Sequence, residues 1–267
     1  MLPIVDKPVI QYLVEEAVEA GITDIMIVTG RGKQAIGNHF DASFELEKTL
    51  VEKGKIKELE LVEKVANLAR IAYVRQPLPR WDGDALLRAQ AWIGNEPCLV
   101  LFGDDLIRGE KGGATQLLEA YRKKQAPIIA LERVADKRVS SYGIVESSLQ
   151  EGNIYRVAKF LEKPKPEETP SRLGVIGKYI ITPQVFEYLA QDGFRASKDG
   201  EIRLADAFAR MVNAGEEVYG LEMEGDRYDT GDKFGFLKAT IDYALARDDL
   251  GPQLFELLKD RVSRYES

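Results

Sequence analysis

Two adjacent carboxylates, Asp104 and Asp105, lie just past the end of an apolar run from Cys98 to Phe102. Such a continuous run predicts a strand buried on both faces of a largely parallel sheet, and Gly103 marks its end. Ligands bind at the carboxyl ends of strands in open α/β sheets, and Mg²⁺ held through one or two carboxylates usually accompanies a phosphate substrate. The acidic pair therefore indicates a metal and phosphate site, although a solvated acidic turn is equally compatible with the pair alone.

Four further segments at separate places along the chain carry polar side chains, and three of them carry glycines. With the acidic pair they form an ordered set of five: MLPIVDKPVIQY (1–12); VRQP (74–77) with Gly83 and Ala85; FGDD (102–105); YGIV (142–145) with FLEKP (160–164); and GEI (200–202) with DTGDK (229–233). In this order and spacing, the set resembles the bacterial UTP–glucose-1-phosphate uridylyltransferases (UDP-glucose pyrophosphorylases) of the sugar-phosphate nucleotidyltransferase superfamily. The resemblance runs from Met1 to about Gly251.

The resemblance implies a Mg²⁺-dependent enzyme that condenses UTP with glucose 1-phosphate to give UDP-glucose and pyrophosphate. It implies that Gln76 reads the edge of the uracil, a task that suits a carboxamide because this group both donates and accepts hydrogen bonds. Gly83 matches a glycine that lets the backbone approach the nucleotide. Asp104 matches the Mg²⁺ ligand, and Asp229 matches a second acid on the metal side. Without the resemblance, Gln76 would be a loop-capping side chain and Gly83 a turn glycine.

Four residues match positions around the sugar. The resemblance places Asp105 near the hexose and packs Gly143 against it. Glu162 matches the acid that accepts hydrogen bonds from sugar hydroxyls, and Lys163 matches the cation that holds the sugar phosphate. Without the resemblance, the sequence Glu-Lys-Pro at 162–164 would be a solvated surface turn.

Attack of a sugar phosphate on the α-phosphorus of UTP needs charge neutralisation and in-line positioning more than a protein nucleophile. We therefore expect two catalytic residues: Asp104, through the metal ion, and Lys163, at the attacking phosphate. The reaction needs no Ser/His/Asp triad. The single histidine, His39, is expected to be structural.

The chain departs from the family pattern most clearly at its start. In the family, a first strand, a Gly-rich loop and a Pro-Lys-Glu segment precede the Met-Leu-Pro with which this sequence opens, and those elements cradle the triphosphate. We expect the sheet to consist of two halves that lack this shared central strand. A start site placed too late is the favoured explanation, and a truncated, non-catalytic relative is the alternative.

Smaller departures affect the loops around the base and the sugar. Trp81 and Asp84 stand where the family often has Gly and His, and Gly103 stands where many members have Pro. Arg203 and Ala205 replace the usual Gln and Thr. These differences leave the exact base and sugar open. The alternative functions are a sibling enzyme that uses dTTP or another sugar phosphate, and a non-catalytic regulatory subunit that binds nucleotide sugars.

Strands and helices that alternate in the first half predict the sheet that positions these residues. Strands are expected at 25–28, 71–74, 98–102 and 128–131, and helices after Pro8, at 85–93 and at 113–124, with a helix-prone polar stretch at 33–67. The second half favours strands at 143–146, 154–161, 175–181 and 218–223. It favours helices near 183–190, 204–213, 234–247 and 252–262.

This pattern predicts an α/β fold with a doubly wound, mixed and mainly parallel sheet, Rossmann-like, as in nucleotide-diphospho-sugar transferases. A small β-rich lobe would bind the sugar. One nucleotidyltransferase domain is expected over residues 1–267, with a nucleotide-binding half at 1–135, a sugar-binding half at 136–232 and C-terminal helices at 233–267. The resemblance also implies a homo-oligomer, a dimer or a tetramer, with the C-terminal helices as candidate contacts.

Composition narrows the class of protein further. The chain has 267 residues, a formal net charge of −7 and one cysteine, Cys98. The acidic balance argues against a nucleic-acid partner, and a single cysteine excludes an intrachain disulfide. No apolar run approaches the ~18 residues of a membrane span, and the N-terminus lacks the basic-then-apolar order of a signal peptide. A cytoplasmic enzyme without a membrane partner is therefore expected.

Overall fold

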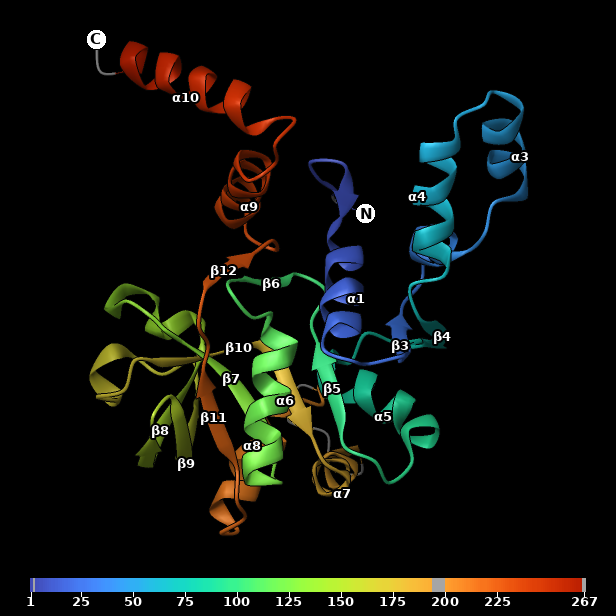
Figure 1. Ribbon diagram of the computed structural model, residues 1–267. Helices are drawn as coiled ribbons and strands as arrows, with labels where there is room; N and C mark the ends of the chain where they lie inside the picture. The colour runs from blue at the N-terminus through green and yellow to red at the C-terminus, as the bar shows by residue number, and fades with distance from the viewer. Residues whose placement is uncertain (2, 194–199, 266–267) are drawn as a thin grey trace.

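Helices and strands alternate along the chain in the computed structural model, which describes residues 1, 3–193 and 200–265 (Figure 1). The α-helices are α1 (Val9–Glu19), α2 (Gln34–Phe40), α3 (Phe44–Glu52), α4 (Ile56–Ala66), α5 (Trp81–Ile93), α6 (Gly113–Lys124), α7 (Pro183–Gly193), α8 (Leu204–Asn213), α9 (Lys233–Leu245) and α10 (Gly251–Tyr265). The strands are β1 (Pro3–Ile4), β2 (Lys7–Pro8), β3 (Asp24–Thr29), β4 (Arg70–Arg75), β5 (Cys98–Leu101), β6 (Asp105–Arg108), β7 (Ile128–Arg133), β8 (Gly143–Glu151), β9 (Ile154–Glu162), β10 (Leu173–Ile181), β11 (Tyr219–Glu222) and β12 (Asp226–Asp229). Short 3-10 helices at Asp136–Ser141 and Pro166–Glu168 precede β8 and follow β9.

A six-stranded mixed sheet forms the centre of the molecule, in the order β5-β10-β7-β11-β9-β8. β7 and β11 pair in parallel, whereas β10 pairs antiparallel with β5 and β7, and β9 pairs antiparallel with β8 and β11. It follows that β5, β7, β11 and β8 run in one direction and that β9 and β10 run against them. The α/β fold with a mixed sheet is confirmed. The prediction of mainly parallel pairing is wrong for this sheet, because β9 and β10 run against the other strands and β7–β11 is its one parallel pair among the described residues.

Strand β7 is buried on both faces, as its continuous apolar sequence predicts. Ile128 and Ala130 pack with α6 on one face of the sheet. Ile129 and Leu131 pack on the other face, in the cluster formed with α5, α7 and α8. The sheet is thus the middle of three layers, and the helices on both faces fix the strand ends from which the site loops emerge (Figure 1).

Strands β3 and β4 form a separate parallel pair, in register from Asp24 opposite Arg70 to Thr29 opposite Arg75. Among the residues that the structure describes, no strand joins β3 to β5, which lies at the end of the six-stranded sheet and pairs with β10 alone. The sheet therefore has two parts without a shared central strand, as expected. The prediction that β5 is fully buried is wrong, because at this edge position only Val100 of its four residues is buried.

Helix α1 connects the two parts of the sheet. Val14 of α1 packs against Ile27 of β3. On another side of the helix, Glu16 forms an ion pair with Lys178 of β10, with 2.8 Å between Oε2 and Nζ. The side chains of Lys178 and Glu16 are 0% and 8% exposed, so this pair is buried. α1 therefore holds the β3–β4 pair against the six-stranded sheet.

Two pairs of helices project from this centre (Figure 1). α3 and α4 form a hairpin on one side, and α9 and α10 lead from β12 to the C-terminus on the other. Tyr243 anchors α9 through edge contacts with Tyr12 of α1 and Tyr228 of β12, with ring centroids 4.9 and 5.6 Å apart. None of the helices in the described ranges combines the length and the apolar character needed to cross a membrane.

Most predicted elements are present, several of them longer at one end. α6 and α8 have the predicted bounds, and the polar stretch at 33–67 forms α2, α3 and α4. The sequence does not predict β1 and β2, because two residues leave no pattern, nor β6 and β12, because charged residues interrupt these four-residue strands. His39 Nε2 lies 2.9 Å from Gln11 Oε1, and burial lowers the pKa of His39, which suits the expected structural role.

Candidate active site

The carboxylates of Asp104 and Asp229 converge on one glycine. Asp104 lies in the turn between β5 and β6, and Asp229 ends β12, opposite Asp105 in the β6–β12 pair. The backbone N–H and the hydroxyl of Thr230 both donate to the carbonyl of Asp104, at 2.8 and 2.9 Å. A Cβ on Gly231 would lie 2.8 Å from Asp104 Oδ2 and 3.2 Å from Asp229 Oδ1. Glycine is therefore needed at 231 for both carboxylates to approach the backbone this closely.

The charge at this point favours a bound cation. Partial burial raises the pKa of Asp104 above its ordinary value, and the neighbouring charges of Asp105 and Asp229 raise it further. In the described part of the chain, no group of three or more His, Cys, Asp and Glu side chains is arranged to hold a metal ion. Mg²⁺ is commonly bound by one or two carboxylates, and waters and substrate phosphates complete its coordination. The pair Asp104 and Asp229 fits that donor set.

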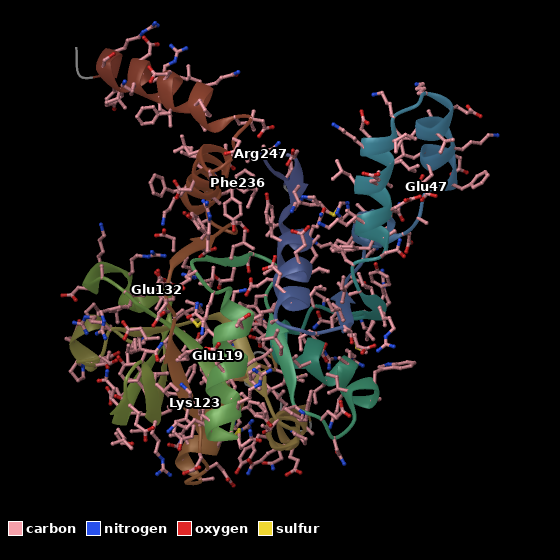
Figure 2. The ribbon with its side chains drawn as sticks, viewed as in Figure 1. Glu47, Glu119, Lys123, Glu132, Phe236 and Arg247 are labelled. Carbon is pink, nitrogen blue, oxygen red and sulfur yellow. The ribbon has the colours of Figure 1, made fainter. Side chains whose placement is uncertain are left out.

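Arg227 of β12 links the acidic residues to the interior. Its guanidinium donates to both carboxylate oxygens of Asp105, at 2.5 and 3.0 Å. It also donates to Glu132 at 2.9 Å, labelled in Figure 2, and to the hydroxyl of Tyr142 at 3.0 Å. Its Nη2 lies 3.6 Å from Asp229 Oδ2. Burial opposes the charge of Arg227, but the hydrogen bonds with Asp105 raise its pKa above the ordinary value.

Both carboxylate oxygens of Asp105 are engaged. Besides the bonds from Arg227, its Oδ2 accepts the backbone N–H of Gly177 in β10 at 2.7 Å. A Cβ on Gly177 would lie 2.9 Å from that oxygen, so a side chain there would displace the carboxylate. Asp105 is 5% exposed. Its expected contact with a sugar stays a prediction, and in this structure its carboxylate holds Arg227 and β10 together.

A cavity of about 460 Å³ opens beside this network, between the β8–β9 hairpin and the starts of α5 and α8. Aromatic rings and a few charged side chains line it, a combination typical of small-molecule sites. The lining residues are Trp81, Asp82, Ser141, Tyr142, Gly143, Phe160, Glu162, Lys163, Val175, Tyr179, Arg203, Ala205 and Phe208. Because Tyr142 also accepts a hydrogen bond from Arg227, the cavity and the acidic residues share one hydrogen-bond network.

Three of the four predicted sugar residues line this cavity together. Gly143 pairs with Glu162 across the β8–β9 hairpin, and a Cβ on Gly143 would lie 3.0 Å from the ring of Phe160. Lys163 has a φ of +46°, a left-handed conformation that side chains rarely adopt, and its N–H donates to the carbonyl of Tyr142 at 3.1 Å. Its Nζ lies 4.0 Å from Glu162 Oε1. Partial burial raises the pKa of Glu162 despite the charge of Lys163.

The sequence alone does not identify Asp82 and Tyr179 as site residues. Asp82 accepts the backbone N–H of Leu204 at 2.9 Å and so ties α5 to the start of α8, and burial raises its pKa. Tyr179 is 7% exposed, and burial raises its pKa well above the ordinary value, so its hydroxyl stays protonated. Arg203 lies over the ring of Trp81, with 5.6 Å to the centroid. Asp82 directly precedes Gly83, a residue that the sequence does identify, and this position is the local signal that could have indicated Asp82.

Gln76 and Gly83 lie near the start of α5, which forms one wall of the cavity. Gln76 directly follows β4, and its Nε2 donates to the carbonyl of Trp81 and to Asp84 Oδ2, both at 2.9 Å. Gly83 is buried, and a Cβ there would lie 2.8 Å from the carbonyl oxygen of Ile202. This close packing already requires glycine. A contact of Gly83 with a nucleotide stays a prediction.

The structure thus brings the predicted residues into three groups that adjoin one another. One group is acidic, one lines the cavity, and one follows β4: Asp104 with Asp229; Gly143 with Glu162 and Lys163; and Gln76 with Gly83. Arg227 joins the first two groups through Tyr142. Trp81 joins the last two, because it lines the cavity and accepts a hydrogen bond from Gln76.

Comparisons with known proteins show the family to which this chain belongs. A family model described as nucleotidyl transferase matches residues 1–245. A UTP–glucose-1-phosphate uridylyltransferase of Bacillus subtilis (strain 168) is 44% identical over 266 residues, which is 100% of this chain and 90% of that relative.

Solved structures of similar proteins share the fold. A UDP-glucose pyrophosphorylase complexed with UDP-glucose superposes with a TM-score of 0.81 and 37% identity, over 92% of this chain and 90% of that one. A UTP-bound UGPase from Acinetobacter baumannii superposes with a TM-score of 0.84 and 35% identity, over 97% of this chain and 90% of that one. With its fold, its paired carboxylates and these similarities established together, the chain belongs to the nucleotidyl transferase family.

Proposed function

We propose that this protein transfers a uridylyl group from UTP to glucose 1-phosphate, with UDP-glucose and pyrophosphate as products. The observation that carries the proposal is the network in which Arg227 and Tyr142 join Asp229, which meets Asp104 at Gly231, to a cavity of about 460 Å³. A phosphate-transfer site needs these two parts side by side, one for charge neutralisation and one for the sugar. Relatives named for this reaction, and similar structures that hold UTP and UDP-glucose, support the choice of substrates.

In the proposed reaction, a phosphate oxygen of glucose 1-phosphate forms a bond to the α-phosphorus of UTP. The bond from the α-phosphorus to the bridging oxygen breaks, and pyrophosphate leaves with the electron pair. Lys163 at the cavity wall holds the attacking phosphate through its ammonium charge, and Glu162 accepts hydrogen bonds from the sugar hydroxyls. Gly143 leaves room for the sugar beside the ring of Phe160.

Asp104 and Asp229 are the residues that would hold Mg²⁺, and Gly231 keeps their oxygens together. When bound, Mg²⁺ neutralises charge on the phosphate oxygens of the nucleotide. Asp105 acts indirectly in this proposal, because its carboxylate fixes Arg227, whose Nη2 lies 3.6 Å from Asp229 Oδ2. In this way the protein keeps Asp105 buried and paired with Arg227, and it leaves Asp104 and Asp229 for the metal ion.

Gln76 is the proposed reader of the base. It lies at the carboxyl end of β4, the position where ligands bind in α/β sheets. Its carboxamide contacts the segment that begins α5 and lines the cavity. Gly83, in the first turn of the same helix, shapes that wall by its close packing against Ile202.

Pyrophosphate release from UTP and glucose 1-phosphate in the presence of Mg²⁺ tests the proposal. Asp104→Asn should abolish turnover, because an uncharged carboxamide is a poor Mg²⁺ ligand. Asp226→Asn is the matched control, since it makes the same change at the exposed start of β12 and should leave turnover unchanged. Activity that survives Asp104→Asn would refute the assigned metal site. Equal turnover with dTTP would make the protein a nucleotidyltransferase of broader base range.

A homo-oligomer is part of the proposal, with α9 and α10 as its contact surface. Large apolar side chains on these helices are exposed: Phe234, Leu237, Phe255, Leu257 and Val262. Exposed apolar side chains gathered on projecting helices favour association. Light scattering coupled to size-exclusion chromatography tests this, and a monomer at micromolar concentration would contradict it.

A further inference from the structure

The carboxamide of Gln76 has both of its N–H groups engaged within the protein. Nε2 donates one hydrogen bond to the carbonyl oxygen of Trp81 and one to Asp84 Oδ2, each at 2.9 Å. A carboxamide nitrogen has two hydrogens, so these bonds use its full donor capacity. Oε1 accepts no hydrogen bond within the described residues and is the group left for a ligand.

The carboxamide of Gln76 cannot flip, that is, exchange the positions of Oε1 and Nε2, in this environment. A backbone carbonyl and a carboxylate accept hydrogen bonds and donate none, so a flip would set Oε1 against two acceptors. Asp84 is 3% exposed, which leaves little access for a water that could relieve such a contact. Its other oxygen, Oδ1, accepts a hydrogen bond from Arg88 at 3.0 Å, which holds the carboxylate one turn into α5.

The backbone supports the same orientation. Trp81 has a φ of +70°, in the left-handed region that disfavours a large side chain. This conformation presents the carbonyl of Trp81 to Gln76. A strained backbone conformation of this kind persists only where contacts with the surrounding structure hold it in place, and such conformations are common at ligand sites.

We propose that Asp84, held by Arg88, is a positioning residue that fixes Gln76 as a hydrogen-bond acceptor and so sets the base preference of the site. An acceptor selects a pyrimidine with an N3–H donor, uracil or thymine. It disfavours cytosine, whose N3 is itself an acceptor. This inference rests on the proposed function in one respect, namely that Gln76 faces the base.

Asp84→Asn tests the inference, because the carboxamide that it introduces can donate to Oε1. Of the two acceptors that oppose a flip, only the carbonyl of Trp81 then remains, so Gln76 can turn its N–H groups toward the base in part of the molecules. The readout is the ratio of kcat/KM for UTP to that for CTP, with Mg²⁺ and glucose 1-phosphate constant. We expect this ratio to fall about tenfold, the effect of one hydrogen bond gained with cytosine and lost with uracil. Asp24→Asn is the matched control, since Asp24 also pairs with an arginine, Arg70, at the opposite end of β3 and β4.

Each outcome decides between a positioning and a merely structural role. If Asp84→Asn slows both nucleotides equally and keeps the ratio, Asp84 is structural and the inference fails. Gln76→Ala separates this failure from that of the proposed function. A ratio that falls in Gln76→Ala but not in Asp84→Asn overturns the inference alone, whereas a ratio unchanged in Gln76→Ala shows that Gln76 does not read the base.

A second measurement applies if Asp84→Asn does not fold. In the unaltered protein, the side-chain amide resonances of Gln76 can be assigned by their loss in Gln76→Ala. Both Nε2 protons should stay protected from exchange, and their shifts should stay nearly constant, when UTP is added. A large shift with loss of the bonds to Trp81 and Asp84 would show that Gln76 donates to the nucleotide, and it would overturn the inference.

Discussion

Replacing Arg227 by methionine removes the guanidinium that holds the Asp105 carboxylate inside the protein. The side chains of Arg227 and Asp105 are 9% and 7% exposed, and they share hydrogen bonds of 2.5 and 3.0 Å. Without Arg227, Asp105 keeps the N–H of Gly177 but loses its bidentate cationic partner. Breaking a buried ion pair on one side costs about 3–5 kcal/mol. We therefore expect Arg227→Met to lower the free energy of unfolding by about that amount.

Urea unfolding followed by circular dichroism measures this change. Arg70→Met is the matched control, because Arg70 also donates two hydrogen bonds to one aspartate, Asp24, at 2.6 and 2.7 Å. The side chains of this second pair are 78% and 67% exposed. An exposed pair contributes about 0–1 kcal/mol, so the control should stay close to the wild-type stability.

The double variant Arg227→Met, Asp105→Asn identifies the cause. A carboxamide at 105 can still accept the N–H of Gly177, but it carries no charge that needs a partner. The second substitution should therefore recover part of the lost stability. If Arg227→Met costs no more than Arg70→Met, or if Asp105→Asn lowers stability further by an independent amount, the stranded charge is not the reason and the reasoning is refuted.

Three other predictions concern the site. Because the pKa of Asp104 is raised in the folded protein, folding favours the neutral form of this carboxyl group. Asp104→Asn should therefore raise the Tm at pH 7 and have little effect on it below pH 3.8. Calorimetry measures both, and equal shifts of the Tm at the two pH values would contradict this. Lys163→Asn should stay within about 1 kcal/mol of wild-type stability, since Asn tolerates the left-handed φ of +46°. It should raise the KM for glucose 1-phosphate about tenfold or more. An equal rise in the KM for UTP would argue against a role of Lys163 at the sugar phosphate. Gly143→Ala should cost about 1–3 kcal/mol in chemical denaturation, because its Cβ would lie 3.0 Å from the ring of Phe160, and a neutral result would show that the ring moves aside freely.

The sequence predicts the parts of the site that depend on strand ends. Apolar runs closed by Gly or a polar residue identify β4 and β5, and Gln76 and Asp104 lie just past the ends of these two strands. Contacts between distant segments have no such pattern. Arg227 and Asp105 are 122 residues apart, and so are Asp82 and Leu204, so neither pair follows from spacing along the chain.

The role of Asp84 shows the same limit at short range. The sequence shows that Asp84 stands where the family often has His. What this difference does depends on how Asp84 meets Gln76 and Arg88 in the folded protein. The bond from Arg88 is an i,i+4 contact within α5, but the bond from Gln76 exists only because the start of α5 folds back against the end of β4. Composition and periodicity carry no information about such a turn.

Two kinds of residue stand out in the site, and their energetics differ. The buried carboxylates Asp105 and Asp84 are each paired with an arginine, so they hold neighbouring groups in place. The residues that face a ligand in the proposal show the opposite behaviour: the pKa of Asp104 is raised by burial and by like charges, and Lys163 and Trp81 have left-handed backbone. A surface with no ligand would have little reason to concentrate repulsion and strain at its open positions while it pairs the charges beneath them. This distribution is what a binding site requires, because the bound cation and phosphates supply the interactions that the unliganded chain lacks.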